Sequence, residues 1–315
     1  MNDVETNFGI LEGVSVCDFY DDDSIRDCIL NKCNILKTQY GELIPQYEDN
    51  GIRRKNLHSL SFFKNGNIKY ISLQSQTSVK TGIGDICAEY ITFYDDMTIK
   101  RVFPLNGKLS GYWSEEDEFE LAKEIEFHMS IGDFKCKVIG IQFYKNGNVK
   151  SITLWPKSKI EINTPFGAIA TRIGLSFYEN GNIKSLEPRI PTTIETPIGR
   201  ITAFDSAANG INGDKNSLCF TEDGFLKALS TSSNLVEVTD FSGNIELYKP
   251  LITQSMLGGA EKELIPMKIE FNKNKVKFNN SAEYDIGIFN FSIKKYAPNL
   301  QHTCSSCSSC TGCST

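Results

Sequence analysis

Four cysteines close the sequence, and their side chains could act together as metal ligands. Cys304, Cys307, Cys310 and Cys313 are spaced C-x2-C-x2-C-x2-C, and only Ser, Thr and Gly lie between them. Thiolates at this density suit Zn, Cu(I) or an iron–sulfur cluster. These four residues are therefore the candidate metal site of the chain, with the identity of the metal left open.

The spacing of these cysteines departs from two common thiolate sites. A structural zinc site normally uses two C-x2-C pairs separated by a longer excursion, whereas here the two pairs adjoin. Bacterial ferredoxins use C-x2-C-x2-C-x3-C-P, but the last gap here is shorter and no Pro follows Cys313. A multi-thiolate cluster like that of a metallothionein fits the loose spacing better.

Three other interpretations of residues 300–315 stay open. Ser, Thr and Cys are the residues on which dehydration and thioether chemistry acts, so the chain could be a precursor whose tail is enzymatically modified. The tail could also form disulfides with a partner, as a redox or anchoring segment. Finally, it could be a disordered terminus of no fixed role, because Ser, Thr and Gly cannot build a core. The tail is expected to be flexible unless something ties it down.

The rest of the chain lacks the residue patterns of common enzymes. Its three histidines, His58, His128 and His302, are not spaced as metal ligands, and the sequence contains no GxSxG, P-loop or Rossmann glycine pattern. We therefore expect a protein that is not an enzyme.

Two polar clusters have simpler explanations than metal binding. Asp21-Asp22-Asp23 falls at a predicted turn, where Asp is favoured. Asn212, Asp214 and Asn216 alternate like the start of a calcium loop. However, Ser217 stands where that loop needs Gly, and Asp223 where it needs Glu, so an ordinary loop is favoured.

Charge and termini limit the possible partners and location. The 315-residue chain carries a net charge of -6, which gives no electrostatic footprint for nucleic acid or an anionic membrane. The one dense basic cluster, Arg53-Arg54-Lys55, is expected to be a solvated loop. The first residues lack the pattern of a signal peptide, and no apolar run approaches a membrane span. These features predict a cytoplasmic protein whose cysteines are mostly reduced.

One phrase is repeated along the chain, and it predicts the β-hairpins that position the other residues. It consists of an apolar-aromatic run, then Asn-Gly or Asp-Gly, then a β-branched or Leu run, which is the strongest short-range signal for a β-hairpin. Clear copies are LSFFKNGNIKYISL (60–73), IQFYKNGNVKSITL (141–154), LSFYENGNIKSL (175–186) and LCFTEDGFLKAL (218–229). Degenerate copies span residues 14–30 and 91–100, and the second has Met97 in the Gly position.

The repeat leaves two strand registers open. In the copy at 141–154, a type I turn followed by a Gly bulge would place Phe143 and Val149 on the same face of the hairpin. A two-residue type I′ turn would instead place Tyr144 with Val149. Because side chains alternate along a strand, the choice decides which residues are buried.

A second phrase alternates with the first. It reads TPFGAI at 164–169 and TPIGRI at 196–201, with weaker copies TGIGDI at 81–86 and TQYGEL at 38–43. Pro at the second position and Gly at the fourth suit a type I turn. The regular spacing of the two turns predicts an ordered array of hairpins.

One short helix interrupts the hairpins. Residues 114–123 read SEEDEFELAK, in which Ser114 can cap a helix and the acidic first turn complements its dipole. Phe119, Leu121 and Ala122 give it only a thin apolar stripe. The helix is therefore expected to be short and to cover the sheet.

The first phrase, F-Y-x-N-G-x-[IV]-K-S, resembles the MORN-like hairpin repeats of bacterial YwqK-type antitoxin proteins. The similarity is clearest at 143–151 and 177–185, and it extends over most of residues 14–250. It implies a scaffold that binds a protein partner and is not a catalyst. The interleaved Thr-Pro-x-Gly phrase and the cysteine tail are not part of that pattern.

Together these features predict an all-β protein. We expect an elongated antiparallel array of β-hairpin repeats over residues 1–299, with one short helix, followed by a flexible Cys-rich tail at 300–315. The expected function is a non-catalytic scaffold for a protein partner. The alternatives are a metal or iron–sulfur carrier that uses the tail, and a precursor whose tail is modified.

Overall fold

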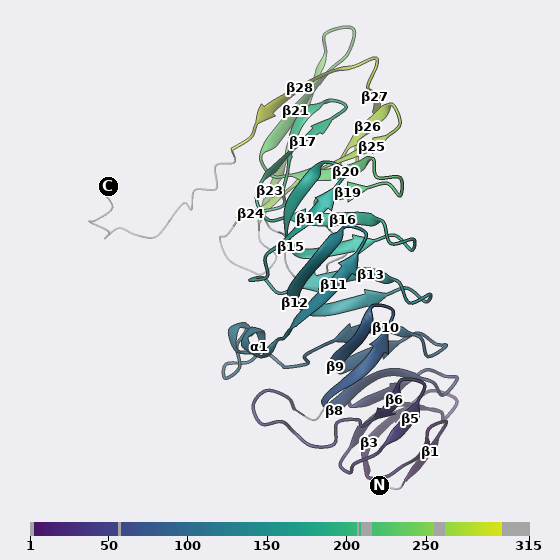
Figure 1. Ribbon diagram of the computed structural model, residues 1–315. Coiled ribbons are helices and arrows are strands. Elements are labelled where there is room, and N and C mark those ends of the chain that lie inside the picture. The colour runs from purple at the N-terminus through teal and green to yellow at the C-terminus, as the bar shows by residue number, and fades with distance from the viewer. Residues whose placement is uncertain (1–2, 56–57, 207, 209–215, 255–261, 298–315) are drawn as a thin grey trace, which may run out of the picture. The chain divides into compact units, whose positions relative to one another are not determined.

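The computed structural model describes residues 3–55, 58–206, 208, 216–254 and 262–297. Over these residues the chain is almost entirely antiparallel β-strand, with a single helix, α1 (Glu115–Leu121) (Figure 1). The predicted all-β array of hairpins with one short helix is therefore confirmed. The predicted flexible tail, residues 300–315, lies outside the described residues.

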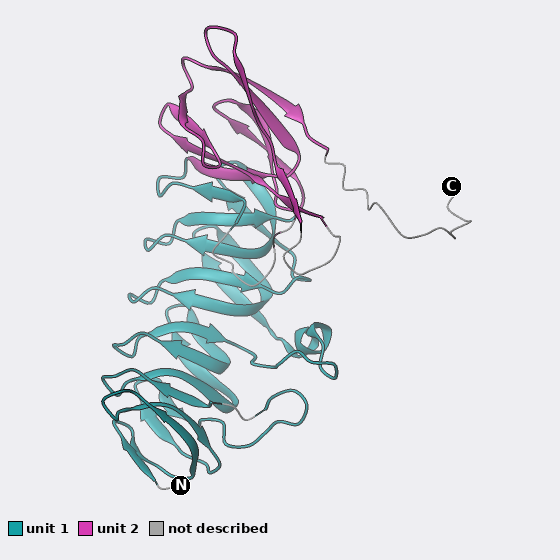
Figure 2. Ribbon diagram, turned by 180° about the vertical axis from the view of Figure 1, so that it is seen from behind, with its two compact units in different colours: residues 1–189, 209–225 teal, residues 190–208, 226–315 magenta. Residues whose placement is uncertain are grey.

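The chain divides into two compact units, which Figure 2 shows in two colours. Unit 1 comprises residues 1–189 and 209–225, and unit 2 comprises residues 190–208 and 226–315. From the sequence, both were expected to belong to one repeat domain over residues 1–299.

Unit 1 contains α1 and seventeen of the strands described. These are β1 (Val4–Thr6), β2 (Gly9–Leu11), β3 (Val14–Phe19), β4 (Ile25–Leu30), β5 (Leu36–Thr38), β6 (Gly41–Leu43), β7 (Leu60–Phe62), β8 (Ile68–Thr81), β9 (Gly84–Phe93), β10 (Ile99–Phe103), β11 (Glu124–Met129), β12 (Gly132–Phe143), β13 (Val149–Leu154), β14 (Ile160–Thr164), β15 (Gly167–Phe177), β16 (Ile183–Pro188) and β19 (Leu218–Phe220).

Unit 2 contains the remaining strands. These are β17 (Thr192–Thr196), β18 (Gly199–Ala203), β20 (Leu226–Thr231), β21 (Asn234–Thr239), β22 (Ile245–Tyr248), β23 (Leu251–Gln254), β24 (Lys262–Ile265), β25 (Met267–Asn272), β26 (Lys275–Phe278), β27 (Glu283–Asp285) and β28 (Asn290–Lys295). Within unit 2, β21 pairs with β22 and β28, while β25 joins β20 to β26.

Unit 1 is a stack of two alternating kinds of hairpin, each built by one of the two repeated phrases (Figure 2). Each long strand takes part in one hairpin of each kind. In β12, residues 132–137 pair with β11, and residues 138–143 pair with β13. The strands β8, β9 and β15 are shared in the same way. Each hairpin is thereby hydrogen-bonded to the next one along the stack.

The structure decides the register that the sequence left open. Phe143 pairs with Val149, the N–H of Tyr144 donates to the carbonyl of Asn148 (2.8 Å), and Gly147 has φ 86°. These contacts are those of a type I turn followed by a Gly bulge. The same pair of backbone hydrogen bonds closes the turns that begin at residues 20, 63, 94, 178, 221 and 240.

The second phrase also forms tight hairpins, and its threonine has a role that the sequence analysis did not assign. At residues 164–167, the Thr164 hydroxyl donates to the carbonyl of Gly167 (2.7 Å) and accepts from the N–H of Phe166 (3.1 Å). Thr6, Thr38, Thr81 and Thr196 make the same two bonds. The copy at Thr6 and a further hairpin at 129–132 were not recognised from the sequence.

A row of apolar side chains crosses unit 1 at one repeat position and forms its core. Each member lies directly opposite the next on the neighbouring strand, and all are essentially fully buried: Leu60, Ile71, Ile91, Val102, Ile141, Ile152, Leu175, Leu186 and Leu218. Because side chains alternate along strands, the adjoining positions point to the opposite face of the sheet. That face carries the polar and aromatic residues discussed below.

Helix α1 begins as predicted. The Ser114 hydroxyl accepts from the N–H of Asp117, and the Asp117 carboxylate accepts from the N–H of Ser114, which completes a capping box. Of the apolar stripe, Ala122 is buried and Phe119 packs edge-on against Trp155, whereas Leu121 is half exposed. Glu118, a charged residue, is also buried. A buried charge therefore holds the helix in addition to its apolar contacts.

Candidate functional site

The residues that the sequence singled out as possible site residues do not form a common site in the part of the chain that the structure describes. Cys304, Cys307, Cys310 and Cys313 lie outside the described residues, so their role as metal ligands stays a prediction. Within the described ranges, no three His, Cys, Asp or Glu side chains are grouped so that they could hold a metal ion. His128 lies on β11 beside Asp133, and His58 lies elsewhere, at the edge of a pocket.

The prediction of a solvated basic loop at residues 53–55 is wrong for its two arginines. Arg53 is 7% exposed and Arg54 is 2% exposed, whereas Lys55 is exposed as expected. The error arose because a basic cluster in a loop is usually hydrated, and the sequence gives no sign of the distant carboxylates that make burial of Arg53 possible.

Arg53 is held by two carboxylates from distant parts of unit 1. Its guanidinium donates to both oxygens of Glu89 on β9 (2.9 and 2.7 Å) and to both oxygens of Glu118 on α1 (2.8 Å each). Such forked pairs are the strong form of an ion pair. They attach the helix and the loop around residue 53 to the sheet.

The two carboxylates also bind the segment that leads into the helix. Glu118 accepts from the Trp113 indole (2.7 Å) and the N–H of Gly107 (2.7 Å), and Glu89 accepts from the N–H of Asn106 (2.7 Å). Burial by itself would raise the pKa of Glu118. Its hydrogen bonds with Arg53, Trp113 and Gly107 outweigh burial and hold that pKa below its usual range.

Arg54 is buried beside this cluster but makes a different set of contacts. Its guanidinium donates to the Ser72 hydroxyl (3.0 Å) and to the carbonyl of Leu73 (2.6 Å). Its buried Nε has no hydrogen-bond partner, and no salt bridge to a described residue is formed within 4.0 Å. Removal from water lowers the pKa of Arg54, in contrast to Arg53, whose pKa is raised. Arg54 is thus a buried cation without a direct counter-ion.

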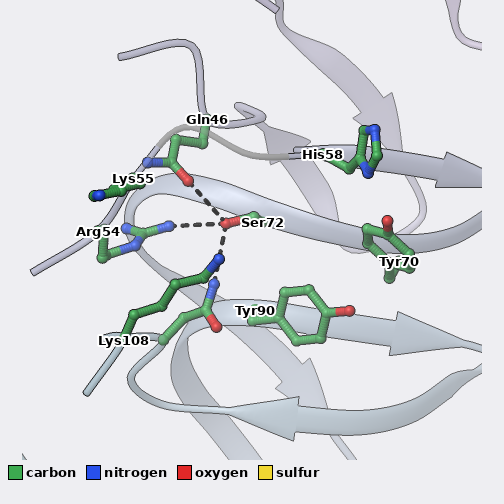
Figure 3. Close-up of a pocket in the computed structure, with 9 residues that line it drawn as sticks. Gln46, Arg54, Lys55, His58, Tyr70, Ser72, Tyr90 and Lys108 are labelled. Atoms are coloured by element: carbon green, nitrogen blue, oxygen red, sulfur yellow. Dashed lines mark hydrogen bonds between the residues drawn. The ribbon is translucent and has the colours of Figure 1, made fainter. Parts of the chain in front are cut away.

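Arg54 forms part of a pocket of about 360 Å³, which we call the Arg54 pocket (Figure 3). Ser72 lies at its centre: its hydroxyl accepts from Arg54 and Asn106 and donates to Gln46 (3.2 Å). The pocket is lined by Gln46, Arg54, Lys55, His58, Tyr70, Ser72, Tyr90, Asn106 and Lys108. Three of these residues are cationic and none is acidic.

A second hollow adjoins the Arg54 pocket on the same face of the sheet. It has a volume of about 530 Å³ and shares Tyr70 and Tyr90 with the first. Its other lining residues are Phe63, Lys69, Thr92, Phe93, Lys100, Arg101, Phe103 and Gln142. We call the two hollows together the basic groove, because they contain six Lys or Arg side chains and no carboxylate.

The strand register explains how the repeat builds the groove. Tyr70 lies opposite Thr92, Thr92 opposite Arg101, and Arg101 opposite Gln142. Further along the sheet the same positions hold small buried residues, Ser151, Ser176 and Ser185. The groove therefore lies where large side chains replace serine at one position of the repeat.

The hydroxyl of Tyr70 provides a fixed wall for the groove. It donates to the Asp27 carboxylate (3.1 Å), and burial followed by the charge of Asp27 raises the pKa of Tyr70 well above its ordinary value. Tyr70 thus stays neutral and serves as a hydrogen-bonding and aromatic surface.

Comparisons with known proteins identify no relative: no protein-family model, no curated protein and no solved structure matches the chain. The resemblance to MORN-like repeats thus stays a prediction. Within the described residues, α1 has seven residues, and no helix is long and apolar enough to cross a membrane.

Proposed function

We propose that this protein is a non-catalytic repeat scaffold that binds an acidic segment of a protein partner in the basic groove. The observation that carries the proposal is the charge of the groove lining, which contains six cations and no carboxylate beside the rings of Tyr70, Tyr90 and Phe103. The Asp27 carboxylate that accepts from Tyr70 is not part of this lining. The chain as a whole has a net charge of -6, so this surface is opposite in sign to the molecule.

The chemistry of the groove favours a peptide over a nucleic acid. Tyr and Arg are the residue types that contribute most to protein-protein contacts, because they combine apolar area with hydrogen bonds. Nucleic acid would meet long-range repulsion from an acidic molecule. An acidic peptide carries fewer charges and can place them along the groove, where Lys69, Lys100 and Arg101 follow the two tyrosines.

The proposal is tested with a fluorescein-labelled glutamate-rich peptide and the same peptide with glutamine in place of glutamate. We expect the purified chain to bind the acidic peptide in preference to the neutral one, and binding to weaken as salt is added. The variant Lys69→Glu/Lys100→Glu should weaken this binding by about tenfold or more.

A matched control comes from the repeat itself. Lys150 and Lys184 occupy the same hairpin position as Lys69 and Lys100 in later copies, but they do not line the groove. Lys150→Glu/Lys184→Glu changes the net charge equally and should leave binding close to that of the unmodified chain. Equal binding of both peptides, or equal losses in the two variants, would argue against the groove as the docking surface.

A further inference from the structure

The Arg54 pocket contains more positive charge than the neighbouring carboxylates neutralise. Arg53 is satisfied by Glu89 and Glu118, so the carboxylates nearest to Arg54 are already engaged in forked pairs. The pocket lining adds the ammonium groups of Lys55 and Lys108 to the buried charge of Arg54. Grouping like charges destabilises a folded chain unless an anion compensates them.

Backbone hydrogen bonds anchor the two segments that carry these residues. The N–H of Lys108 donates to the carbonyl of Arg53 (2.9 Å), and the N–H of Asn50 donates to the carbonyl of Arg54 (2.8 Å). Figure 3 shows the side chain of Lys108 extending toward Ser72 at the centre of the pocket. Arg54, Lys55 and Lys108 thus line one cavity, although they come from two segments of the chain.

A buried unpartnered donor supplies a second, independent observation. Arg54 is 2% exposed, and its Nε is the one guanidinium nitrogen that finds no acceptor. A buried N–H left without a partner costs free energy, so the protein satisfies the guanidinium of Arg54 only in part. An anion in the pocket would compensate this cation through its charge and not through Nε, which has no exposed surface.

We propose that the Arg54 pocket binds a phosphate monoester group, with Arg54, Lys55 and Lys108 as its charge partners. A phosphate monoester carries close to two negative charges at neutral pH and three strong acceptor oxygens, which matches three cations and the amide of Asn106 better than a carboxylate does. The volume of about 360 Å³ exceeds that of one ion, and Tyr70 and Tyr90 can contact the organic part.

This inference rests on the proposed function, because it assigns the Arg54 pocket to a phosphorylated residue of the acidic partner segment. A free phosphorylated metabolite would present the same group. The two sources differ in one respect: only a peptide would also use the lysines of the second hollow.

The experiment measures binding of inorganic phosphate, and of a phosphoserine-containing acidic peptide with its unphosphorylated form, by titration calorimetry and by the shift in Tm. We expect Tm to rise as the phosphate concentration increases, because phosphate would bind the folded chain. The phosphopeptide should bind at least tenfold more tightly than the unphosphorylated peptide. In Lys55→Gln/Lys108→Gln, affinity for phosphate should fall by about tenfold for each lysine removed.

Two further variants keep the test decisive. Both Lys55 and Lys108 are exposed, so their loss should not unfold the chain, and Lys150→Gln/Lys184→Gln is the matched control with the same charge change. Arg54→Met probes the buried cation directly. If phosphate fails to bind the unmodified chain, or if the Lys55/Lys108 variant matches the control, the inference is wrong.

The outcome separates this inference from the proposed function. Phosphate binding that is lost in the Lys55/Lys108 variant, without any binding of either peptide, would keep the phosphate site and assign it to a free metabolite. Binding of the acidic peptide through Lys69 and Lys100, without any effect of phosphate, would keep the protein scaffold and remove the phosphate site.

Discussion

Met97 occupies the turn position where the clearest copies of the repeat have glycine, and it adopts φ 68° there. The equivalent Gly66, Gly147 and Gly181 have φ between 80° and 87°. An L-residue with a Cβ in this region is strained by about 1 kcal/mol or more, whereas glycine is not. The hairpin therefore forms in spite of this residue, because its strands pair with β8 and β12 on either side.

Replacing Met97 with glycine should stabilise the chain. We expect Met97→Gly to raise the free energy of unfolding by about 0.5–1 kcal/mol, because relief of the strained φ exceeds the entropy lost by glycine on folding. Met97→Ala keeps the Cβ and should bring no gain. Denaturant titration of the two variants measures the difference, and a loss of stability in Met97→Gly would contradict the strain argument.

Tyrosine in the repeated phrase links one hairpin to the next. The hydroxyls of Tyr20, Tyr94, Tyr144 and Tyr178 each donate to the carbonyl of the aromatic strand residue of the following hairpin, at 2.7 to 2.9 Å. The second Asn of the phrase makes a parallel bond, as in Asn148 to the carbonyl of Glu179 (2.8 Å). The Tyr and the second Asn of the phrase therefore serve contacts between hairpins and not the turn itself.

Removal of one such hydroxyl should cost the value of one hydrogen bond. Tyr178 donates to the carbonyl of Phe220 at 2.7 Å, and we expect Tyr178→Phe to lower the free energy of unfolding by about 1 kcal/mol. Tyr112 is 83% exposed, so Tyr112→Phe is the control and should be neutral. Equal stability of both variants would mean that the bond makes no net contribution.

Helix α1 depends on a buried ion pair at neutral pH. Glu118→Gln leaves the Arg53 charge with one carboxylate, and we expect it to destabilise the attachment of the helix by about 3 kcal/mol. Glu120→Gln on the exposed side of the same helix is the control. Hydrogen exchange over residues 104–121 reports the effect, and unchanged protection would show that the helix is held by other contacts.

The same pair predicts a pH dependence. The pKa of Glu118 is lower in the folded chain than in the unfolded chain, where it is about 4.3. Its contribution to stability is therefore complete above that value and is lost as the pH falls through the folded pKa. Wild type should lose stability more steeply than Glu118→Gln over this acidic range.

At the scale of the molecule, the repeat places the core on one face of the sheet of unit 1 and the proposed binding residues on the other. In unit 1 the apolar row from Leu60 to Leu218 is continuous, so each hairpin completes the core of its neighbours. The opposite face is free to vary from one hairpin to the next. The large side chains of Tyr70, Tyr90 and Arg101 line the basic groove. In later hairpins this face carries the small, buried side chains of Ser151, Ser176 and Ser185.

The four tail cysteines make a prediction for the whole chain. If they are metal ligands, zinc, copper or iron with sulfide should accompany anaerobically purified full-length protein and be lost from a chain that ends at Asn299. Intact mass from the native source measures modification in the same samples. Metal that remains with the shorter chain would exclude the tail as its site, and equal metal-free, unmodified masses would leave the tail without either role.

Much of the fold could be predicted from the sequence, because hairpins are encoded locally. Asn-Gly and Thr-Pro-x-Gly fix turns through backbone conformations that span four residues, and Ser114 fixes the start of α1. The strand register could not be predicted, because the two candidate turns differ by one residue and the choice depends on which face is buried against the core.

The candidate site was beyond prediction for a different reason. Arg53, Glu89 and Glu118 are far apart in the sequence, and only the folded sheet brings them together. The one signal was the basic cluster at 53–55, which appears the same whether it is solvated or buried. The sequence by itself determined the hairpins, their alternation and the helix, since each follows from short-range preferences. Tertiary structure alone decided which arginine is paired and which faces a pocket, because the counter-charges of a buried group come from wherever the stacked strands place them.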